Sequence, residues 1–145
     1  MKTYCFVLMP FGTKVDESAR QVNFDAIFEQ IFAPAIESAE LEPIRADEEM
    51  YGGIIHKPMF ERLMICRYAV ADLTTANPNV FYELGIRHGI RPHSTVLTFA
   101  KGMRLPFDVA PLRGLPYWLN EHGYPIDIDK TRNALAERLI ECRNP

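Results

Sequence analysis

The order of apolar and polar positions along the chain predicts alternating strands and helices. The continuous apolar run Tyr4–Met9 is typical of a strand that is covered on both faces, and it is expected to be central. Tyr68–Asp72 is a short, largely apolar segment of β type that ends in an acid. Apolar positions at helical spacing extend from Phe24 to Ile36, where Pro34 should kink the helix or start a second segment. Leu41–Arg45 is predicted to be a short strand, and its proline favours an edge position.

The second half of the chain continues the alternation. Helical patterns are predicted from about Pro58 to Cys66, from Pro78 to about Gly89, and from Asp129 to Cys142. Ser94–Phe99 has the composition of a fourth strand, and Pro116–Leu119 is a candidate for a fifth. Short connections between alternating strands and helices indicate parallel strand pairing.

These elements predict one α/β domain over residues 1–145, with a doubly wound, mostly parallel five-stranded sheet of flavodoxin-like or Rossmann-like type. The polar stretch Thr13–Val22 is predicted to be a mobile loop. In a flavodoxin-like strand order, the loops after the first and third strands flank the point where the order reverses. Pro10-Phe11-Gly12 and Thr74–Asn79 are therefore expected to line one crevice.

Composition narrows the class of partner. The 145 residues carry 16 Lys and Arg against 19 Asp and Glu, a formal net charge of -3, which argues against binding to a nucleic acid polymer or an anionic membrane. A small-molecule ligand fits better. No apolar run approaches the roughly 20 residues of a bilayer span, and the chain enters a strand pattern at Tyr4 with no secretory signal. Cys5, Cys66 and Cys142 show no CxxC spacing, so a reduced, cytoplasmic protein is expected.

The stretch from Asp72 to Gly85 places a carboxylate where a strand gives way to a helix. Asn77 is a good helix N-cap, and Glu83 then lies near the second helical turn, where the helix dipole favours an ionised carboxylate. Such a group suits a nucleophile, although Glu83 also fits a solvated helix position with Arg87 as an ordinary ion-pair partner. Asp72 is a candidate catalytic acid or, equally, a residue that caps its own loop.

The other candidate ligand-binding residues each carry a weaker signal when taken alone. Asp47 follows the second strand, where an acid binds ribose hydroxyls in dinucleotide folds, and His56 precedes a helix start, where it suits a phosphate. The alternative for Asp47 and His56 is a solvated surface position. Lys14 and Arg20 suit a loop that screens the charge of a phosphate, and a solvated loop is again the alternative. The chain has no phosphate-binding GxxxxGK[ST], no GxGxxG and no metal-ligand spacing, so neither a metal nor a cofactor is expected.

Taken together, the motifs Met9-Pro10-Phe11-Gly12, Ile55-His56 and Tyr82-Glu83-Leu84-Gly85 resemble the nucleoside 2-deoxyribosyltransferase superfamily, including its 2'-deoxynucleoside 5'-phosphate N-glycosidase branch. The resemblance implies that Glu83 attacks the anomeric carbon of the sugar and that Met9–Gly12 helps to bind the sugar or its 5'-phosphate. It also suggests a homo-oligomer. Asn77 and Asn79 are candidate binding residues because their loop is expected to line the crevice, and helix capping is the alternative for both. The stretch from Phe6 to Gly85 further resembles bacterial domains joined to signalling modules, which suggests nucleotide processing or sensing.

One position departs from the family pattern. Met59 stands where the superfamily has an aspartate, and a thioether has no proton to give to a departing base. The general acid must then be another residue, with Asp72, Asp47, Glu61 and His56 as the candidates. The sequence therefore predicts an N-glycosidase or glycosyl transferase acting on a nucleoside, a nucleotide or an NAD-like molecule. The alternative is a weakly active or inactive nucleotide-binding scaffold.

Overall fold

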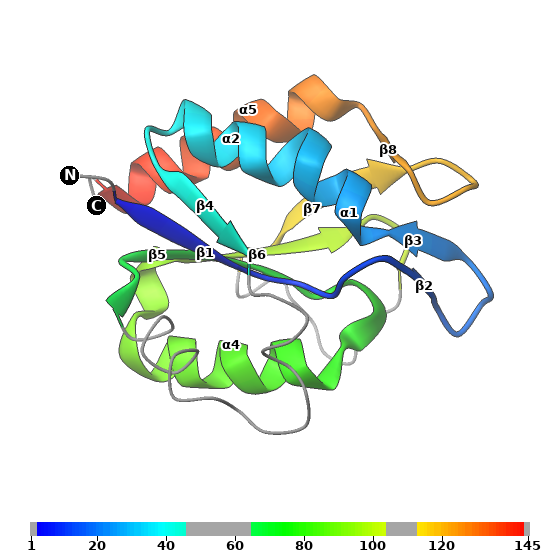
Figure 1. Cartoon of the computed structure of the whole chain (residues 1–145), viewed down its shortest axis with the longest axis horizontal. Coiled ribbons are helices and arrows are strands. Elements are labelled where there is room, and N and C mark those ends of the chain that lie inside the picture. The colour runs from blue at the N-terminus through cyan, green and yellow to red at the C-terminus, as the bar shows by residue number, and fades with distance from the viewer. Residues whose placement is uncertain (1–2, 46–64, 104–112, 144–145) are drawn as a thin grey trace.

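The computed structural model describes residues 3–45, 65–103 and 113–143, which form a central sheet with helices on both faces (Figure 1). The sheet order is β4-β1-β5-β6-β7-β8. Its strands are β1 (Tyr4–Leu8), β4 (Glu42–Arg45), β5 (Tyr68–Asp72), β6 (Thr95–Ala100), β7 (Leu115–Leu119) and β8 (Pro125–Ile126). All neighbours pair in parallel except β7 and β8, which are antiparallel. The predicted mostly parallel α/β sheet is confirmed, but it has six strands instead of five because the two-residue β8 extends it.

The first strand is an interior strand, as its apolar run predicts. β1 pairs with β4 on one side and β5 on the other, so that Phe6 lies beside both Ile44 and Ala69. After β1 the chain continues to β4 on one side of β1, and the next strand in the sheet, β5, lies on the other side. The strand order therefore reverses at β1. The carboxyl ends of β1 and β5 are neighbours there, and β4 is the edge strand that its proline predicts.

Two layers of helices enclose the sheet (Figure 1). The helices are α1 (Phe24–Ile27), the π-helix η1 (Phe28–Phe32), α2 (Ala33–Ser38), α4 (Pro78–Ile90) and α5 (Ile128–Arg143), with short 3-10 turns η3 (Thr74–Ala76) and η4 (Pro92–Ser94). The run from α1 to α2 and α5 cover one face, and α4 covers the other. On the first face, Phe32 packs edge-on against Tyr117 with ring centroids 6.0 Å apart.

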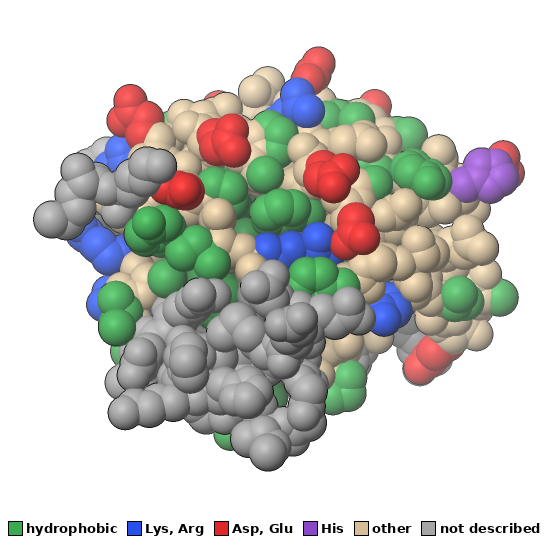
Figure 2. Space-filling view, in the orientation of Figure 1, with side chains coloured by type: hydrophobic (Ala, Val, Ile, Leu, Met, Phe, Trp, Pro, Cys, Tyr) green, Lys and Arg blue, Asp and Glu red, His purple; other side chains and the backbone are tan. Residues whose placement is uncertain are grey.

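Pro34 interrupts the first helix in a specific way. A proline has no N–H to donate to the carbonyl four residues earlier, which is that of Gln30. Arg132 of α5 donates to this carbonyl instead, at 2.6 Å, and the turn before the proline is widened into the π-helix η1. Glu29 and Glu37 are exposed on this layer. Figure 2 shows several acidic side chains on the face in view.

The prediction of a mobile loop at Thr13–Val22 is wrong. This stretch contains an antiparallel hairpin of β2 (Thr13–Val15) and β3 (Gln21–Asn23). Asp16 closes its turn by accepting hydrogen bonds from the Ser18 and Arg20 amides, each at 2.8 Å. Arg20 also donates to Asp16 and to the Gly102 carbonyl at 2.9 Å. The polar residues that suggested a loop are the ones that hold this turn together.

The predicted helix from Pro58 lies outside the described residues, apart from its last positions Ile65 and Cys66. The other predicted helices and strands are present, with ends shifted by one or two residues. In the three described stretches, no helix has both the length and the hydropathy to cross a bilayer.

The turn before β8 supplies a test of the packing between the hairpin and the sheet. Gly123 has φ +85, and a Cβ placed on it would lie 2.4 Å from the Gln21 carbonyl oxygen. We expect Gly123→Ala to lower the free energy of unfolding by about 2 kcal/mol or more, because both the backbone conformation and the space require glycine. Gly89→Ala, at an uncrowded position of α4, should instead raise it by roughly 0.5–1 kcal/mol. Urea unfolding of both variants measures this, and equal effects would contradict the described packing.

Candidate functional site

A pocket of about 240 Å³ lies where the strand order reverses. The residues that line this switch-point pocket are Met9, Pro10, Phe11, Lys14, Asn77, Asn79 and Val80. They come from the end of β1, from β2 and from the start of α4. The structure thus brings together six residues that the sequence nominated from distant segments, and the expected meeting of the two loops is observed. Carboxyl ends of strands at a switch point are the usual place for a ligand in such sheets.

Gly12 is not among the described residues that line this pocket. It has φ +67, its N–H donates to Asp25 at 3.0 Å, and its carbonyl accepts from the Phe24 amide at 2.9 Å. Its backbone groups are therefore engaged within the protein, so Gly12 acts as a turn residue here and not as part of the pocket lining.

Four residues named from the sequence cannot be placed. Asp47, His56, Met59 and Glu61 lie outside the described residues, so their proposed roles stay predictions. The described part of the site consists of the loops after β1 and β5, the hairpin and helix α4.

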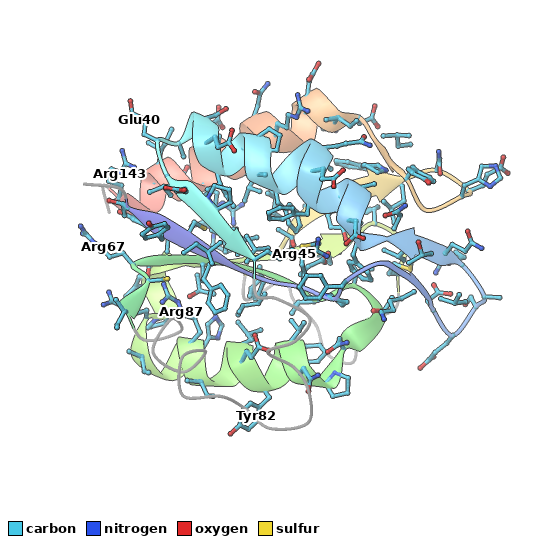
Figure 3. The ribbon with its side chains drawn as sticks, in the orientation of Figure 1. Glu40, Arg45, Arg67, Tyr82, Arg87 and Arg143 are labelled. Atoms are coloured by element: carbon cyan, nitrogen blue, oxygen red, sulfur yellow. The ribbon has the colours of Figure 1, made fainter. Side chains whose placement is uncertain are left out.

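Arg45, which the sequence analysis did not nominate, holds the loop after β1 in place. It stands at the end of β4 near the middle of the molecule (Figure 3), with its side chain only 12% exposed. Its guanidinium donates to the Pro10 carbonyl at 2.6 Å, pairs with Asp25 at 2.9 Å, and lies 4.2 Å from the centre of the Phe11 ring. The Gly12 N–H, and then Arg45, lower the pKa of Asp25, so this carboxylate stays ionised. The only sequence signal was an arginine at the end of a predicted strand.

The start of α4 is already capped from within. Asn77 Oδ1 accepts from the Asn79 amide at 2.9 Å and the Val80 amide at 3.3 Å, and the Phe81 amide donates to the Asn77 carbonyl. Pro78 has no N–H. The predicted N-cap role of Asn77 is confirmed. The first amides of the helix are therefore engaged, and a bound anion would meet Lys14 and the helix dipole instead of free backbone N–H groups.

Glu83 lies on the side of α4 that faces the sheet. The buried positions of this helix are Val80, Glu83, Leu84 and Arg87, which form a single stripe at helical spacing. Glu83 is 1% exposed and lies one turn beyond Val80, which lines the switch-point pocket. The carboxylate is thus behind the wall of the pocket. Figure 3 shows the contrast with Tyr82, which points away from the sheet.

Arg87, the next polar residue on this stripe, is fully buried. It donates to the Cys66 carbonyl, to Thr95 Oγ1 at 2.9 Å and to Ser94 Oγ at 3.3 Å. Burial lowers the pKa of Arg87 to about 10, which leaves it charged at neutral pH. Arg87 therefore ties α4 to the start of β6 and to the residues before β5, and it is more than a surface partner of Glu83.

Asp72 belongs to a buried ring of three side chains. The Tyr117 hydroxyl donates to Asp72 Oδ2 at 2.7 Å, and Thr74 donates to Asp72 Oδ1 at 2.7 Å from its hydroxyl and 3.1 Å from its amide. The Thr74 and Tyr117 oxygens are 2.9 Å apart, and Thr74 also accepts from the Ala100 amide. Asp72 is fully buried, so it holds the loop after β5 and does not border the switch-point pocket.

Burial of this Asp72 ring shifts Asp72 toward the neutral acid. Three oxygen pairs lie at hydrogen-bond distance, but the two hydroxyl groups supply only two protons. When Asp72 is protonated, its own hydroxyl donates to Thr74, the Thr74 hydroxyl turns to donate to Tyr117, and every pair then shares a hydrogen. Burial raises the pKa of Asp72 to about 6, although the hydrogen bonds from Tyr117 and Thr74 oppose the rise. Burial also raises the pKa of Tyr117 well above its usual value, and the Asp72 charge adds to this effect. The sequence analysis missed Tyr117, because nothing in its strand marks it as a partner of Asp72.

No metal centre is visible in the described stretches, where no three His, Cys, Asp or Glu side chains lie close enough to share an ion. The chemistry that these residues offer is therefore that of one carboxylate behind a pocket, one lysine at its edge and polar amide side chains on α4.

The Asp72 ring predicts a pH dependence of stability. The folded protein holds this proton up to about pH 6 whereas the unfolded chain releases it near its ordinary value of 3.8, so the contribution of the ring is complete below pH 3.8 and is lost as the pH rises through about 6. Asp72→Asn keeps a neutral donor in the ring. Relative to wild type, it should gain roughly 2 kcal/mol of stability between pH 4 and pH 7.5. Denaturant unfolding across this range, with the exposed Asp129→Asn as control, measures the change. A difference in unfolding free energy between Asp72→Asn and wild type that stays constant over this pH range would contradict the protonated ring.

The cap of α4 can be separated from any ligand contact of Asn77. Asn77→Ala should lower the free energy of unfolding by about 1 kcal/mol, because two helix amides lose their acceptor. Asn77→Asp should stay within a few tenths of a kcal/mol of wild type, since aspartate caps equally well. Thermal unfolding of the two variants decides this. Equal destabilisation by both would show that the side chain acts through something other than the cap.

Comparison with known proteins assigns no family to this chain. No family model matches the sequence. A search of curated proteins also gave no significant match. The resemblance to nucleoside 2-deoxyribosyltransferases consequently depends on the quoted motifs and stays a prediction. Support for a function must come from the pocket and the residues around it.

Proposed function

We propose that the chain binds a nucleoside or nucleotide in the switch-point pocket and hydrolyses or transfers its N-glycosidic bond, with Glu83 as the nucleophile. The observation that carries this proposal is the meeting of Met9–Phe11 with Asn77–Val80 over a pocket, with Glu83 one helical turn beyond Val80. This is the arrangement that the resemblance implies. Lys14 provides a cation for a phosphate at the edge of the pocket.

In the proposed reaction, the Glu83 carboxylate attacks the anomeric carbon while the bond from this carbon to the base nitrogen breaks. The base leaves with a proton from a general acid, and water or a second base then releases the sugar from Glu83. Asp72 is fully buried and both of its carboxyl oxygens are engaged by Thr74 and Tyr117, which disfavours it as the donor. Asp47, Glu61 and His56 stay the candidates for this role.

Three further expectations belong to the same proposal. The strand order is compatible with a flavodoxin-like or Rossmann-like fold, and the switch points of such folds bind nucleotides. The partner is a small molecule and no nucleic acid polymer, in keeping with the net charge of -3. A cytoplasmic homo-oligomer is the expected setting, by resemblance and by cysteine content.

A second candidate function is ligand binding without turnover. Glu83 is 1% exposed and is not among the described residues that border the pocket, so a sugar in this pocket meets Val80 before it meets the carboxylate. Met59, at the position of the superfamily's aspartate, supports the same alternative. A scaffold of this kind would bind a nucleotide and release no base.

Base release from a panel of ribonucleotides, deoxyribonucleotides and NAD, followed by chromatography, separates the two functions. We expect wild type to release base, and Glu83→Gln to lower the rate by at least about 10³-fold while nucleotide affinity is retained. Glu137→Gln, an exposed glutamate of α5, is the matched control and should leave the rate unchanged. Full activity of a folded Glu83→Gln protein would exclude the mechanism. Binding without base release in wild type would favour the scaffold.

A further inference from the structure

A second cavity, of about 200 Å³, lies beside the switch-point pocket. This hairpin pocket is lined by Val15, Asp16, Glu17, Ser18 and Arg20 of the β2–β3 hairpin (Figure 1), together with Thr75 and Met103. The two linings have no residue in common, but residues close together in the chain border one cavity or the other. On β2, Lys14 borders the first and Val15 the second, and in the loop after β5, Asn77 borders the first and Thr75 the second.

The size of the two cavities favours one ligand that fills both. Small-molecule sites usually exceed about 300 Å³. At about 240 Å³ and about 200 Å³, each cavity alone falls short of this, whereas the two together exceed it. A ligand with two arms joined by a narrow link matches two adjoining cavities better than a compact ligand does.

The chemistry of the walls indicates what the link and the second arm are. The hairpin contributes Lys14 to the first cavity and Arg20 to the second, where Arg20 is paired with Asp16 of the same lining. One cationic side chain therefore stands on each side of the junction. Phosphate groups suit this position. Glu17 is exposed at the hairpin pocket, and a carboxylate there is a good acceptor for the hydroxyl groups of a sugar. Met103 adds an apolar, polarisable surface of the kind that packs on a flat ring.

We propose that the hairpin pocket is a second subsite and that the ligand consists of two nucleoside halves joined through a pyrophosphate. One half occupies the switch-point pocket, the phosphates lie between Lys14 and Arg20, and the second sugar binds beside Glu17. This inference rests on the proposed function, because it assigns a nucleotide to the first cavity. It selects the dinucleotide class from the substrates that the sequence leaves open.

Calorimetric titration of the whole chain with AMP, ADP and NAD tests the second subsite. NAD should bind at least about tenfold more tightly than AMP, with ADP in between. Ser18→Tyr, which fills the hairpin pocket, should remove this advantage by weakening NAD about tenfold and AMP less than about twofold. Glu17→Gln should weaken NAD alone by a few fold. The matched controls are Ser38→Tyr and Glu137→Gln, both at exposed positions outside either pocket, and they should change neither affinity.

The outcomes distinguish this inference from the function on which it rests. If AMP binds and NAD binds no more tightly, or if Ser18→Tyr leaves NAD affinity unchanged in a folded protein, the second subsite is excluded and the nucleotide pocket stands. If none of the three ligands binds, both the proposed function and the second subsite are rejected. Selective loss of NAD affinity in Ser18→Tyr and Glu17→Gln would support the two-armed ligand.

Discussion

The carboxyl edge of the sheet depends on the hydrogen-bonded ring of Asp72, Thr74 and Tyr117. It ties the end of β5 to β7, and through the Ala100 amide it reaches the end of β6. These groups are buried, so each lost partner would leave a polar atom without compensation in a region that excludes water. These hydrogen bonds therefore fix the loop that leads from β5 into α4. Thr75, directly after Thr74, keeps a positive φ of 66 in this loop.

A second polar cluster holds the opposite wall. Arg45 joins the end of β4 to the Pro10 carbonyl and to Asp25, and Asp25 in turn accepts from the Gly12 amide. The switch-point pocket lies between two walls that are each fixed by hydrogen bonds across several elements, which favours a pocket that is formed before a ligand arrives. Its polar surface comes from side chains, because the first amides of α4 are taken up by Asn77.

Much of the fold was predictable, because apolar runs and helical spacing report directly which faces are buried. β1 as an interior strand, β4 as an edge strand and Asn77 as a helix cap all follow from local patterns. The hairpin at Thr13–Asn23 does not follow from a local pattern. Its turn depends on hydrogen bonds to Asp16, and in the sequence the polar residues that make them look like those of an ordinary loop. At the site, the meeting of the two loops was predictable from strand order, whereas Arg45 and Tyr117 were not.

The sequence by itself determined the class of fold, the order of its elements and the two segments that meet at the switch point, because these depend on periodicity and on the geometry of parallel strands. Only the tertiary structure decided which polar residues are buried and what they bond. Asp72 and Tyr117 are 45 positions apart, and Arg45 and Pro10 are 35 apart. Such pairs leave no periodic signal in the sequence, because their distance is set by the packing of whole strands and helices and not by their spacing along the chain.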